Sequence, residues 1–296
     1  MRYLSLLIRS MRPQQWVKNV FIFAPMVFSL QFRLQYIWHT LLAFFLFGLV
    51  SSCIYVFNDC FDKQKDRQHP IKKNRPIASG ALGTGAATTG AGIILLLSLT
   101  AIYVYNLYFF YIALIYLVMN IAYSSILKKI VILDVMVIAI GFVLRVQIGG
   151  VINDIQLSTW ILIITFLLAI FLALIKRRQE LIRVNEAINS GNTEIETRGT
   201  LKKYNLVLLD QLISITTATT LISYIIYVAN PNIQQKFHTP YLYLTVPFVV
   251  FGIFRYLYLT YVKGEGESPA EIIFSDIPFT INAIIWVTVF ILLIFK

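Results

Sequence analysis

The chain has 296 residues, of which 58% are hydrophobic and only 13% are charged. About a quarter of the residues of a typical soluble domain are charged, so the composition excludes an ordinary soluble enzyme. The formal net charge of +11 would suggest a nucleic-acid partner in a soluble protein. In a membrane protein, basic residues instead accumulate in cytoplasmic loops. We therefore predict an all-α integral membrane protein that does not bind nucleic acid.

The first 15 residues are expected to form an amphipathic helix that lies on the membrane surface. Apolar residues recur there at helical spacing, with basic residues between them, and these apolar residues are Leu4, Leu7, Ile8 and Met11. The segment does not look like a secretory signal peptide, because Arg9 interrupts the apolar stretch and no small-residue cleavage site follows.

Nine apolar runs follow, each close to the length that a helix needs to cross the hydrocarbon core. The predicted spans are 17–33, 37–57, 88–105, 107–123, 131–150, 157–175, 206–228, 240–262 and 277–295. The second, fourth, sixth and eighth connections between spans, together with the N-terminal segment, hold most of the basic residues. Because basic loops lie in the cytoplasm, we place the N-terminus in the cytoplasm and the C-terminus outside. Residues 1–296 are expected to form a single transmembrane domain with two long cytoplasmic loops, 58–87 and 176–205.

An acidic motif, NDCFDKQKD, follows the second predicted span at residues 58–66. Asp59, Asp62 and Asp66 are spaced i, i+3 and i+7, and Asn58, Asp62 and Asp66 are spaced i, i+4 and i+8. Either set lies on one face if the helix continues. Like charges on one face repel each other unless a cation lies between them. Because carboxylate and amide oxygens are suitable ligands for Mg²⁺, the motif predicts a magnesium site. The alternative is a solvated, charged helix end.

Basic residues follow the acidic motif directly. They are Arg67, Lys72, Lys73 and Arg75. Metal-binding acids next to phosphate-binding cations are typical of a diphosphate site. His69 lies among them, and it is interpreted as a surface histidine.

The fifth predicted span carries two ionisable residues, Asp134 and Arg145. They are 11 residues apart, about three helical turns, and so share a face. A charge this deep in a membrane helix is costly, so Arg145 should face the interior of the bundle. A structural ion pair with another helix is the alternative explanation for Arg145.

The remaining predicted cytoplasmic segments repeat this combination of charged and tyrosine side chains. The sixth span ends in Lys176, Arg177 and Arg178, followed by Glu180; ordinary anchoring by basic residues explains this motif equally well. Further candidates are Arg198, Tyr204, Glu265, Glu267, Glu271 and Asp276. The sequence thus favours chemistry on the cytoplasmic side, with a metal-bound anionic substrate and a lipid as second substrate.

These motifs resemble the UbiA superfamily of intramembrane prenyltransferases, whose first aspartate motif is similar to N-D-x-x-D-x-x-x-D at 58–66. The resemblance to its decaprenyl-phosphate phosphoribosyltransferase branch runs nearly end to end. It is carried by RPQQWVKNVFIFAP at 12–25, DRQHPIKKNRPIASG at 66–80, YSSILKKIVILDVMVIAIGFVLR at 123–145, KRRQEL at 176–181, FRYLYL at 254–259 and ESPAEIIFSD at 267–276. K-R-R-x-E stands where aromatic-acceptor members usually carry a second D-x-x-x-D, which suits a substrate that brings additional phosphate groups.

The resemblance implies a UbiA-type bundle of nine helices and Mg²⁺-dependent transfer of a 5-phosphoribosyl group from phosphoribosyl diphosphate to a polyprenyl phosphate. It implies that Asp62 and Asp66 bind Mg²⁺, with Asn58 and Asp59 as further ligands or as partners of ligands. The implied donor-phosphate contacts are Lys18, Arg67, Lys72, Lys73 and Arg75. The implied contacts to the donor sugar or its phosphate are Tyr123, Lys128 and Asp134. The 5-phosphate or the lipid phosphate is assigned to Lys176, Arg177 and Arg178, with Arg145, Arg198 and Tyr204 as additional substrate-binding candidates.

Two other functions compete with this prediction. An aromatic prenyltransferase with an isoprenyl diphosphate donor would share the aspartate motif and Mg²⁺. A lipid or anion transporter would explain the intramembrane Arg145 and Arg255, but it should show polar sites near the midplane that are reached from both sides. We expect a multi-pass protein of the bacterial inner membrane with its active site facing the cytoplasm. Small residues at 78–92 permit close helix packing, and so a homo-oligomer is compatible with the sequence.

Overall fold

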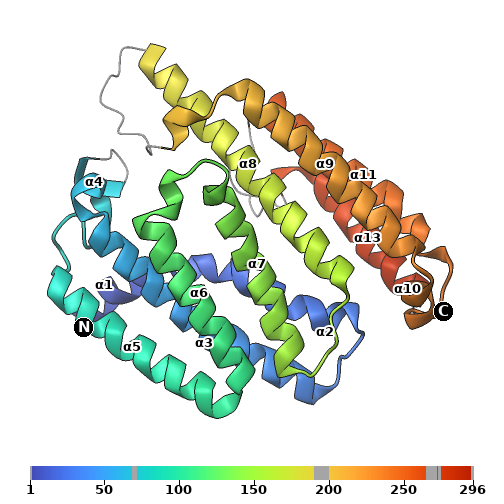
Figure 1. The fold of residues 1–296 in the computed structure, drawn as a ribbon, viewed down its shortest axis with the longest axis horizontal. Helices are drawn as coiled ribbons and strands as arrows, with labels where there is room; N and C mark the ends of the chain where they lie inside the picture. Colours follow the sequence, from blue (N-terminus) through green and yellow to red (C-terminus); the bar gives the residue numbers. More distant parts are fainter. Residues whose placement is uncertain (1, 69–71, 190–199, 265–271, 273–274, 295–296) are drawn as a thin grey trace. The chain divides into compact units, whose positions relative to one another are not determined.

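The computed structural model describes residues 2–68, 72–189, 200–264, 272 and 275–294. Within these residues every regular element is a helix and no strand occurs, which confirms the predicted all-α class. Figure 1 shows the long helices, coloured in chain order.

Eight helical segments of the described chain are long and apolar enough to cross a membrane, so the protein is a multi-pass membrane protein. The helices are α3 (Leu34–Phe61), α5 (Thr84–Tyr105), α6 (Leu107–Ser125), α7 (Leu133–Ile152), α8 (Thr159–Asn189), α9 (Leu206–Ala229), α11 (Val246–Tyr261), which η5 (Tyr241–Thr245) precedes, and α13 (Ile277–Ile294). They match the second to ninth predicted spans. The boundary between α5 and α6 is fixed by Asn106, whose side chain accepts a hydrogen bond from the backbone N–H of Phe109 at 2.9 Å.

The first predicted span, 17–33, has a different structure. After α1 (Arg2–Met11) the chain forms a 3₁₀ helix, η1 (Pro13–Phe23), and a short α-helix, α2 (Ala24–Phe28). This segment is not among the eight long apolar helices. Pro25 lacks a backbone N–H and therefore marks a change of helix type instead of lying inside one continuous α-helix. The ninth crossing stays a prediction.

Two predicted loops contain more helix than expected. In the first, α3 continues to Phe61 and is followed by α4 (Lys63–Gln68) and η2 (Lys72–Asn74). In the second, α8 continues to Asn189, well beyond the predicted end of its span at residue 175. Lys, Arg, Glu and Gln are good helix formers, so a helix need not end where its apolar residues end.

The described residues divide into two compact units between Leu157 and Ser158. In the first unit, α3 contacts η1, α5, α6 and α7. In the second, α9 packs on α8, and α11 packs on α13; this unit also contains η4 (Leu201–Lys203) and α10 (Pro231–Lys236). A single domain spanning 1–296 stays a prediction.

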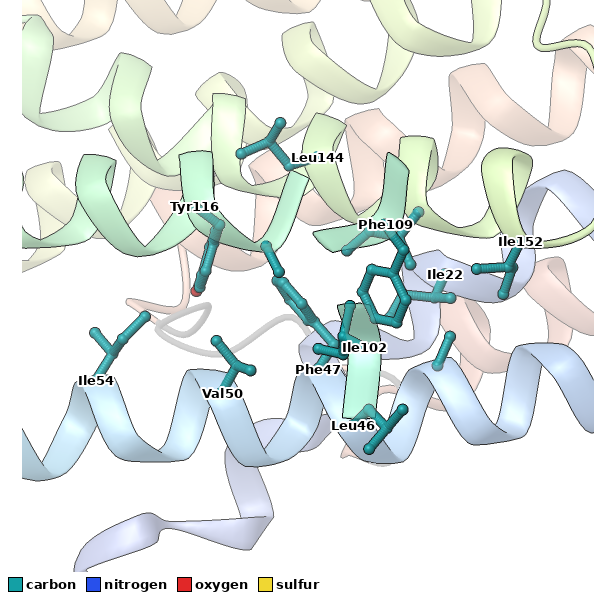
Figure 2. Close-up of a cluster of buried hydrophobic side chains, with 13 residues drawn as sticks. Ile22, Leu46, Phe47, Val50, Ile54, Ile102, Phe109, Tyr116, Leu144 and Ile152 are labelled. Atoms are coloured by element: carbon teal, nitrogen blue, oxygen red, sulfur yellow. The ribbon is translucent and has the colours of Figure 1, made fainter. Parts of the chain in front are cut away.

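The core of the first unit is a cluster of buried apolar side chains around α3. Figure 2 shows Phe47 of α3, Phe109 of α6 and Ile22 of η1 close together, with further side chains from α5 and α7. The ring centroids of Phe47 and Tyr116 are 4.8 Å apart. Inside a bilayer, close packing of this kind is a main source of helix association, because lipid tails are as apolar as the side chains.

Two glycines allow η1 to lie close to α3 and α7. A Cβ on Gly149 of α7 would lie 1.9 Å from the carbonyl oxygen of Ile22, and one on Gly48 of α3 would lie 2.9 Å from the ring of Trp16. The Nε1–H of Trp16 also donates to Ser52 Oγ at 2.8 Å. The position of η1 therefore depends on small residues at two contacts.

We expect Gly149→Ala to destabilise the protein, because the added methyl group would collide with the backbone of Ile22. The expected loss is on the order of 1–3 kcal/mol, typical of overpacking. The measurement is the Tm of the purified protein in detergent. Gly92→Ala is the matched control, because nothing lies within 4 Å of a Cβ there, and alanine should hold or raise the Tm. Equal Tm values for the two variants would contradict the close contact between η1 and α7.

Candidate metal and phosphate site

The acidic motif lies where α3 passes into α4. Asp62 follows the last residue of α3, and its N–H donates to the carbonyl oxygen of Asn58 at 2.9 Å. The N–H of Asp66 donates in turn to the carbonyl oxygen of Asp62 at 2.8 Å. The i to i+4 hydrogen bonds thus continue across the junction, although the α-helix is interrupted at Asp62.

Asp59 and Asp66 share one cation. Nη1 of Arg75 lies 3.1 Å from Oδ1 of Asp59 and 2.6 Å from Oδ2 of Asp66. Both aspartates are 4% exposed. Burying a charged carboxylate without a partner carries a large desolvation cost, so each needs a cation nearby. The guanidinium of Arg75 thus pairs with two carboxylates that lie about two helical turns apart.

Arg12 contributes a second cation to Asp59. Its guanidinium pairs with Oδ1 of Asp59 and lies 5.5 Å from the ring centroid of Tyr55. Arg12 has a φ of 51°, in the left-handed region, at the turn between α1 and η1. Non-glycine residues adopt this conformation at a cost, which surrounding contacts must offset. Neither the amphipathic pattern of the first 15 residues nor the segment at 12–25 predicts this ion pair of Arg12.

Asp62 and Asn58 contact a different part of the unit. Nζ of Lys128 lies 3.1 and 3.2 Å from the two carboxylate oxygens of Asp62, and Ser124 donates a hydrogen bond to Oδ1 of Asn58. The motif therefore has two sides, one facing Arg75 and one facing α6 and the 3₁₀ turn η3 (Leu127–Lys129).

The described residues hold no group of three or more His, Cys, Asp or Glu side chains close enough for a metal ion. The donors nevertheless suit Mg²⁺, because all are hard oxygen ligands. Asp59 and Asp66 already converge on a single cationic nitrogen, Nη1 of Arg75. In this structure, basic side chains neutralise the acids that we assign to the metal.

A pocket of about 420 Å³ adjoins this ion-pair cluster. It is lined by Arg9, Ser10, Arg12, Gln14, Asp59, Lys72, Asn74, Arg75 and Pro76. Four of these side chains are cations and one is a carboxylate, so the pocket favours an anion. Of the predicted site residues, Asp59, Lys72 and Arg75 line it. Arg9 was not predicted, although its place in the amphipathic N-terminal pattern brings it near the membrane surface.

The other predicted residues of this unit have different surroundings. Nε of Arg67 donates to the carbonyl oxygen of Ala78 at 3.0 Å, which supports the turn after η2. Lys18 on η1 and Lys73 are exposed, and Tyr123 on α6 is half-buried. Asp134 is buried in the first turn of α7.

Arg145 is buried, as predicted, with an exposed fraction of 4%. It donates to Asn19 Oδ1 at 2.9 Å, to the carbonyl oxygen of Gly141 at 2.7 Å and to Tyr116 Oη at 3.0 Å. Its guanidinium also lies 5.0–5.4 Å from three aromatic ring centroids, those of Phe47, Tyr116 and Phe142. These contacts join η1, α3, α6 and α7, so Arg145 holds the first unit together.

The second unit contains the basic motif at the end of the apolar part of α8. Lys176 is exposed. Nη1 of Arg177 lies 2.8 Å from Glu180 Oε2, and Nε of Arg178 lies 2.7 Å from Asp210 Oδ1. Tyr204 is buried at the end of η4. These two arginines therefore have acidic partners within their own unit.

Asp276 and Arg255 form a further ion pair in the second unit. Arg255 makes two bonds to the carboxylate, at 3.0 and 2.8 Å, and Asp276 Oδ1 accepts the N–H of Phe279 in the first turn of α13. The hydrogen bond from Arg255 lowers the pKa of Asp276. Other candidates lie outside the described residues, namely His69, Arg198, Glu265, Glu267 and Glu271.

Comparison with known proteins identifies relatives over most of the chain. A model described as the UbiA prenyltransferase family matches residues 20–275. A protein of Corynebacterium glutamicum named decaprenyl-phosphate phosphoribosyltransferase is 29% identical over 287 residues, which cover 95% of this chain and 84% of that protein. A protein of the same name from Mycolicibacterium smegmatis is 33% identical over 180 residues, covering 59% of this chain and 57% of that protein.

A solved structure shows the same fold. It is a UbiA homologue from Archaeoglobus fulgidus bound to DMAPP and Mg²⁺, and it aligns with a TM-score of 0.67 at 18% identity. The alignment covers 97% of this chain and 98% of that chain.

We expect Arg75→Gln to destabilise the protein, because it leaves two buried carboxylates without their shared cation. Loss of one partner of a buried ion pair costs roughly 3–5 kcal/mol. Arg12 would still pair with Asp59 and would offset part of this loss. Adding Mg²⁺ should raise the Tm of Arg75→Gln more than that of the unmodified protein. The control is Arg75→Gln combined with Asp66→Asn, which should lose this Mg²⁺ response. An equal Mg²⁺ response in all three proteins would contradict a metal site at these acids.

Proposed function

The chain belongs to the UbiA prenyltransferase family, and we propose that it transfers a 5-phosphoribosyl group from phosphoribosyl diphosphate to a polyprenyl phosphate of the decaprenyl type. The observation that carries this proposal is the cluster in which buried Asp59 and Asp66 share Arg75 beside a basic pocket. Such a cluster suits a substrate rich in phosphate groups. The name of the two bacterial relatives, decaprenyl-phosphate phosphoribosyltransferase, supports the transferred group and the acceptor.

The proposed reaction is a displacement at C1 of the ribose. An oxygen of the lipid phosphate forms a bond to C1 while the bond from C1 to the diphosphate oxygen breaks. The electron pair of that bond leaves with diphosphate. The lipid phosphate is already an anion, so no general base is needed to create the nucleophile. Catalysis then consists mainly of positioning and of stabilising the charge on the leaving group.

The residues of the first unit divide these tasks. Asp59, Asp62 and Asp66 would hold Mg²⁺, with Asn58 as a further oxygen ligand. Magnesium bound there supplies positive charge to the diphosphate that leaves. Arg75 would contact phosphate oxygens once the metal takes over its two carboxylates.

The basic residues outside this cluster keep weaker assignments. Lys72 would bind phosphate from the wall of the pocket, and Lys128 would contact the donor near Asp62. Lys18, Lys73, Tyr123, Asp134 and the α8 motif stay proposed substrate contacts. For Arg145 and Arg67 the hydrogen bonds within the unit favour a structural role.

We also propose a cytoplasmic active site in the inner membrane, with nine crossings. From the rises of 3₁₀ and α helices, Pro13–Phe28 would span about 30 Å, close to the thickness of the hydrocarbon core. A ninth crossing by this segment would place the N-terminus in the cytoplasm and the C-terminus outside. The basic loops support this orientation.

The competing enzyme function is prenyl transfer to an aromatic acceptor. It is favoured by the fold match to a homologue bound to DMAPP and Mg²⁺. A transporter has less support, because the membrane-embedded arginines have structural partners: Arg255 pairs with Asp276, and Arg145 is hydrogen-bonded within its unit.

The first test of the proposed function is a transfer assay with purified protein, Mg²⁺, polyprenyl phosphate and labelled phosphoribosyl diphosphate. Label should move into the lipid phase and should stop moving when EDTA is added. Asp66→Asn should lower the rate by at least about a hundredfold, because it removes a charged ligand from the proposed metal site. Asp154→Asn is the matched control. Asp154 is exposed just beyond the C-terminal end of α7, and this substitution should leave the rate unchanged.

Transfer of an isoprenyl group to an aromatic acid, with none to polyprenyl phosphate, would overturn the phosphoribosyl proposal and retain the family. Equal rates for Asp66→Asn and Asp154→Asn would overturn the assignment of the metal site.

A further inference from the structure

We propose that the pocket between α1 and η2 binds the phosphate of the lipid acceptor. This inference rests on the proposed function, since it assigns one of the two substrates to a particular place. The pocket belongs wholly to the first unit and has a volume of about 420 Å³. Its lining residues come from the end of α1, the start of η1, the end of α3 and the turn around η2.

The lining of the pocket holds four cations and one carboxylate, and so carries a formal net positive charge. Arg12 and Arg75 pair with Asp59, and Arg75 also pairs with Asp66. Arg9 and Lys72 are the other two cations of the lining. Arg9 is exposed, so its guanidinium is accessible to a ligand. A phosphate monoester matches this excess, because its oxygens can accept several charge-assisted hydrogen bonds at once.

The helix that carries Arg9 indicates that the phosphate is attached to a lipid. Leu7 and Met11 of α1 are buried in a cluster with residues of α3 and α5. Tyr3 Oη donates to the carbonyl oxygen of Ala86 at 2.6 Å, which ties α1 to α5. The same apolar stripe leaves Leu4 and Ile8 exposed, with 59% and 46% of their surface accessible.

A basic helix with exposed apolar residues is suited to the interface between headgroups and acyl chains. The Leu4 and Ile8 edge therefore gives an isoprenoid chain an apolar surface next to Arg9. A soluble sugar phosphate would gain nothing from that surface.

Arg75 links the pocket to the proposed metal site. It lines the pocket, and its Nη1 also contacts Asp66. An acceptor phosphate in the pocket would therefore lie beside the residues that we assign to the donor diphosphate. Two substrates on either side of one arginine fit the displacement proposed above.

The experiment measures binding, so it needs no turnover. Purified protein in detergent is titrated with farnesyl phosphate, phosphoribosyl diphosphate in the presence of Mg²⁺, and inorganic phosphate. We expect Arg9→Gln and Lys72→Gln each to weaken farnesyl phosphate binding roughly tenfold, as expected for loss of one charge-assisted hydrogen bond. The affinity for phosphoribosyl diphosphate should change less than about twofold in Arg9→Gln.

Lys65→Gln is the matched control. Lys65 is an exposed lysine of α4 that does not line the pocket, and its variant should bind farnesyl phosphate like the unmodified protein. Tm values for all variants report whether they fold. If one of the two variants fails to fold, the other carries the test, and Arg9→Lys, which keeps the charge, should retain most of the affinity.

Three outcomes would overturn the inference. Weaker binding of phosphoribosyl diphosphate with unchanged farnesyl phosphate would assign the pocket to the donor. Equal loss for inorganic phosphate and farnesyl phosphate would show a phosphate site without lipid preference. No loss in either variant would show that the pocket binds none of these ligands. A protein that binds farnesyl phosphate through Arg9 and Lys72 but transfers no phosphoribosyl group would refute the proposed function and keep this site.

Discussion

The site depends on the cost of burying carboxylates at the end of a membrane helix. Asp59 and Asp66 are almost fully buried, and a carboxylate removed from water must be paired or must become neutral. Arg75 meets this need for both residues, and Arg12 adds a second cation at Asp59. These ion pairs fix the turn after η2 and the start of η1 against the end of α3. The same cations, placed to neutralise the acids, form the wall of a pocket that suits phosphate.

A second buried charge organises the membrane part of the first unit. Arg145 donates to amide, carbonyl and hydroxyl oxygens, none of them acidic, and its guanidinium lies beside three aromatic rings. Aromatic faces and oxygen atoms both stabilise a guanidinium. Asn19 of η1 is one of these partners. Gly149 has no side chain, and this lets η1 lie against α7. The irregular segment Pro13–Phe23 is thus held by specific contacts along its length.

The sequence predicted the helical spans well, because apolar runs of membrane length have few other interpretations. It also predicted that Arg145 faces inward, because a charge at that depth has no stable alternative. The 3₁₀ conformation of η1 was not predicted, since apolar content does not distinguish one helix type from another. The partners of the acids were not predicted either. Arg12 and Asp59 are far apart in the chain, and only tertiary structure brings them together.

The most direct measurement of the central claim is an electron cryo-microscopy structure of the protein with Mg²⁺ and phosphoribosyl diphosphate bound. The account predicts an ion ligated by oxygens of Asp59 and Asp66, and Arg75 turned from these carboxylates to a phosphate oxygen. An ion bound elsewhere, with Arg75 still between the two carboxylates, would contradict the account and leave the cluster a purely structural one.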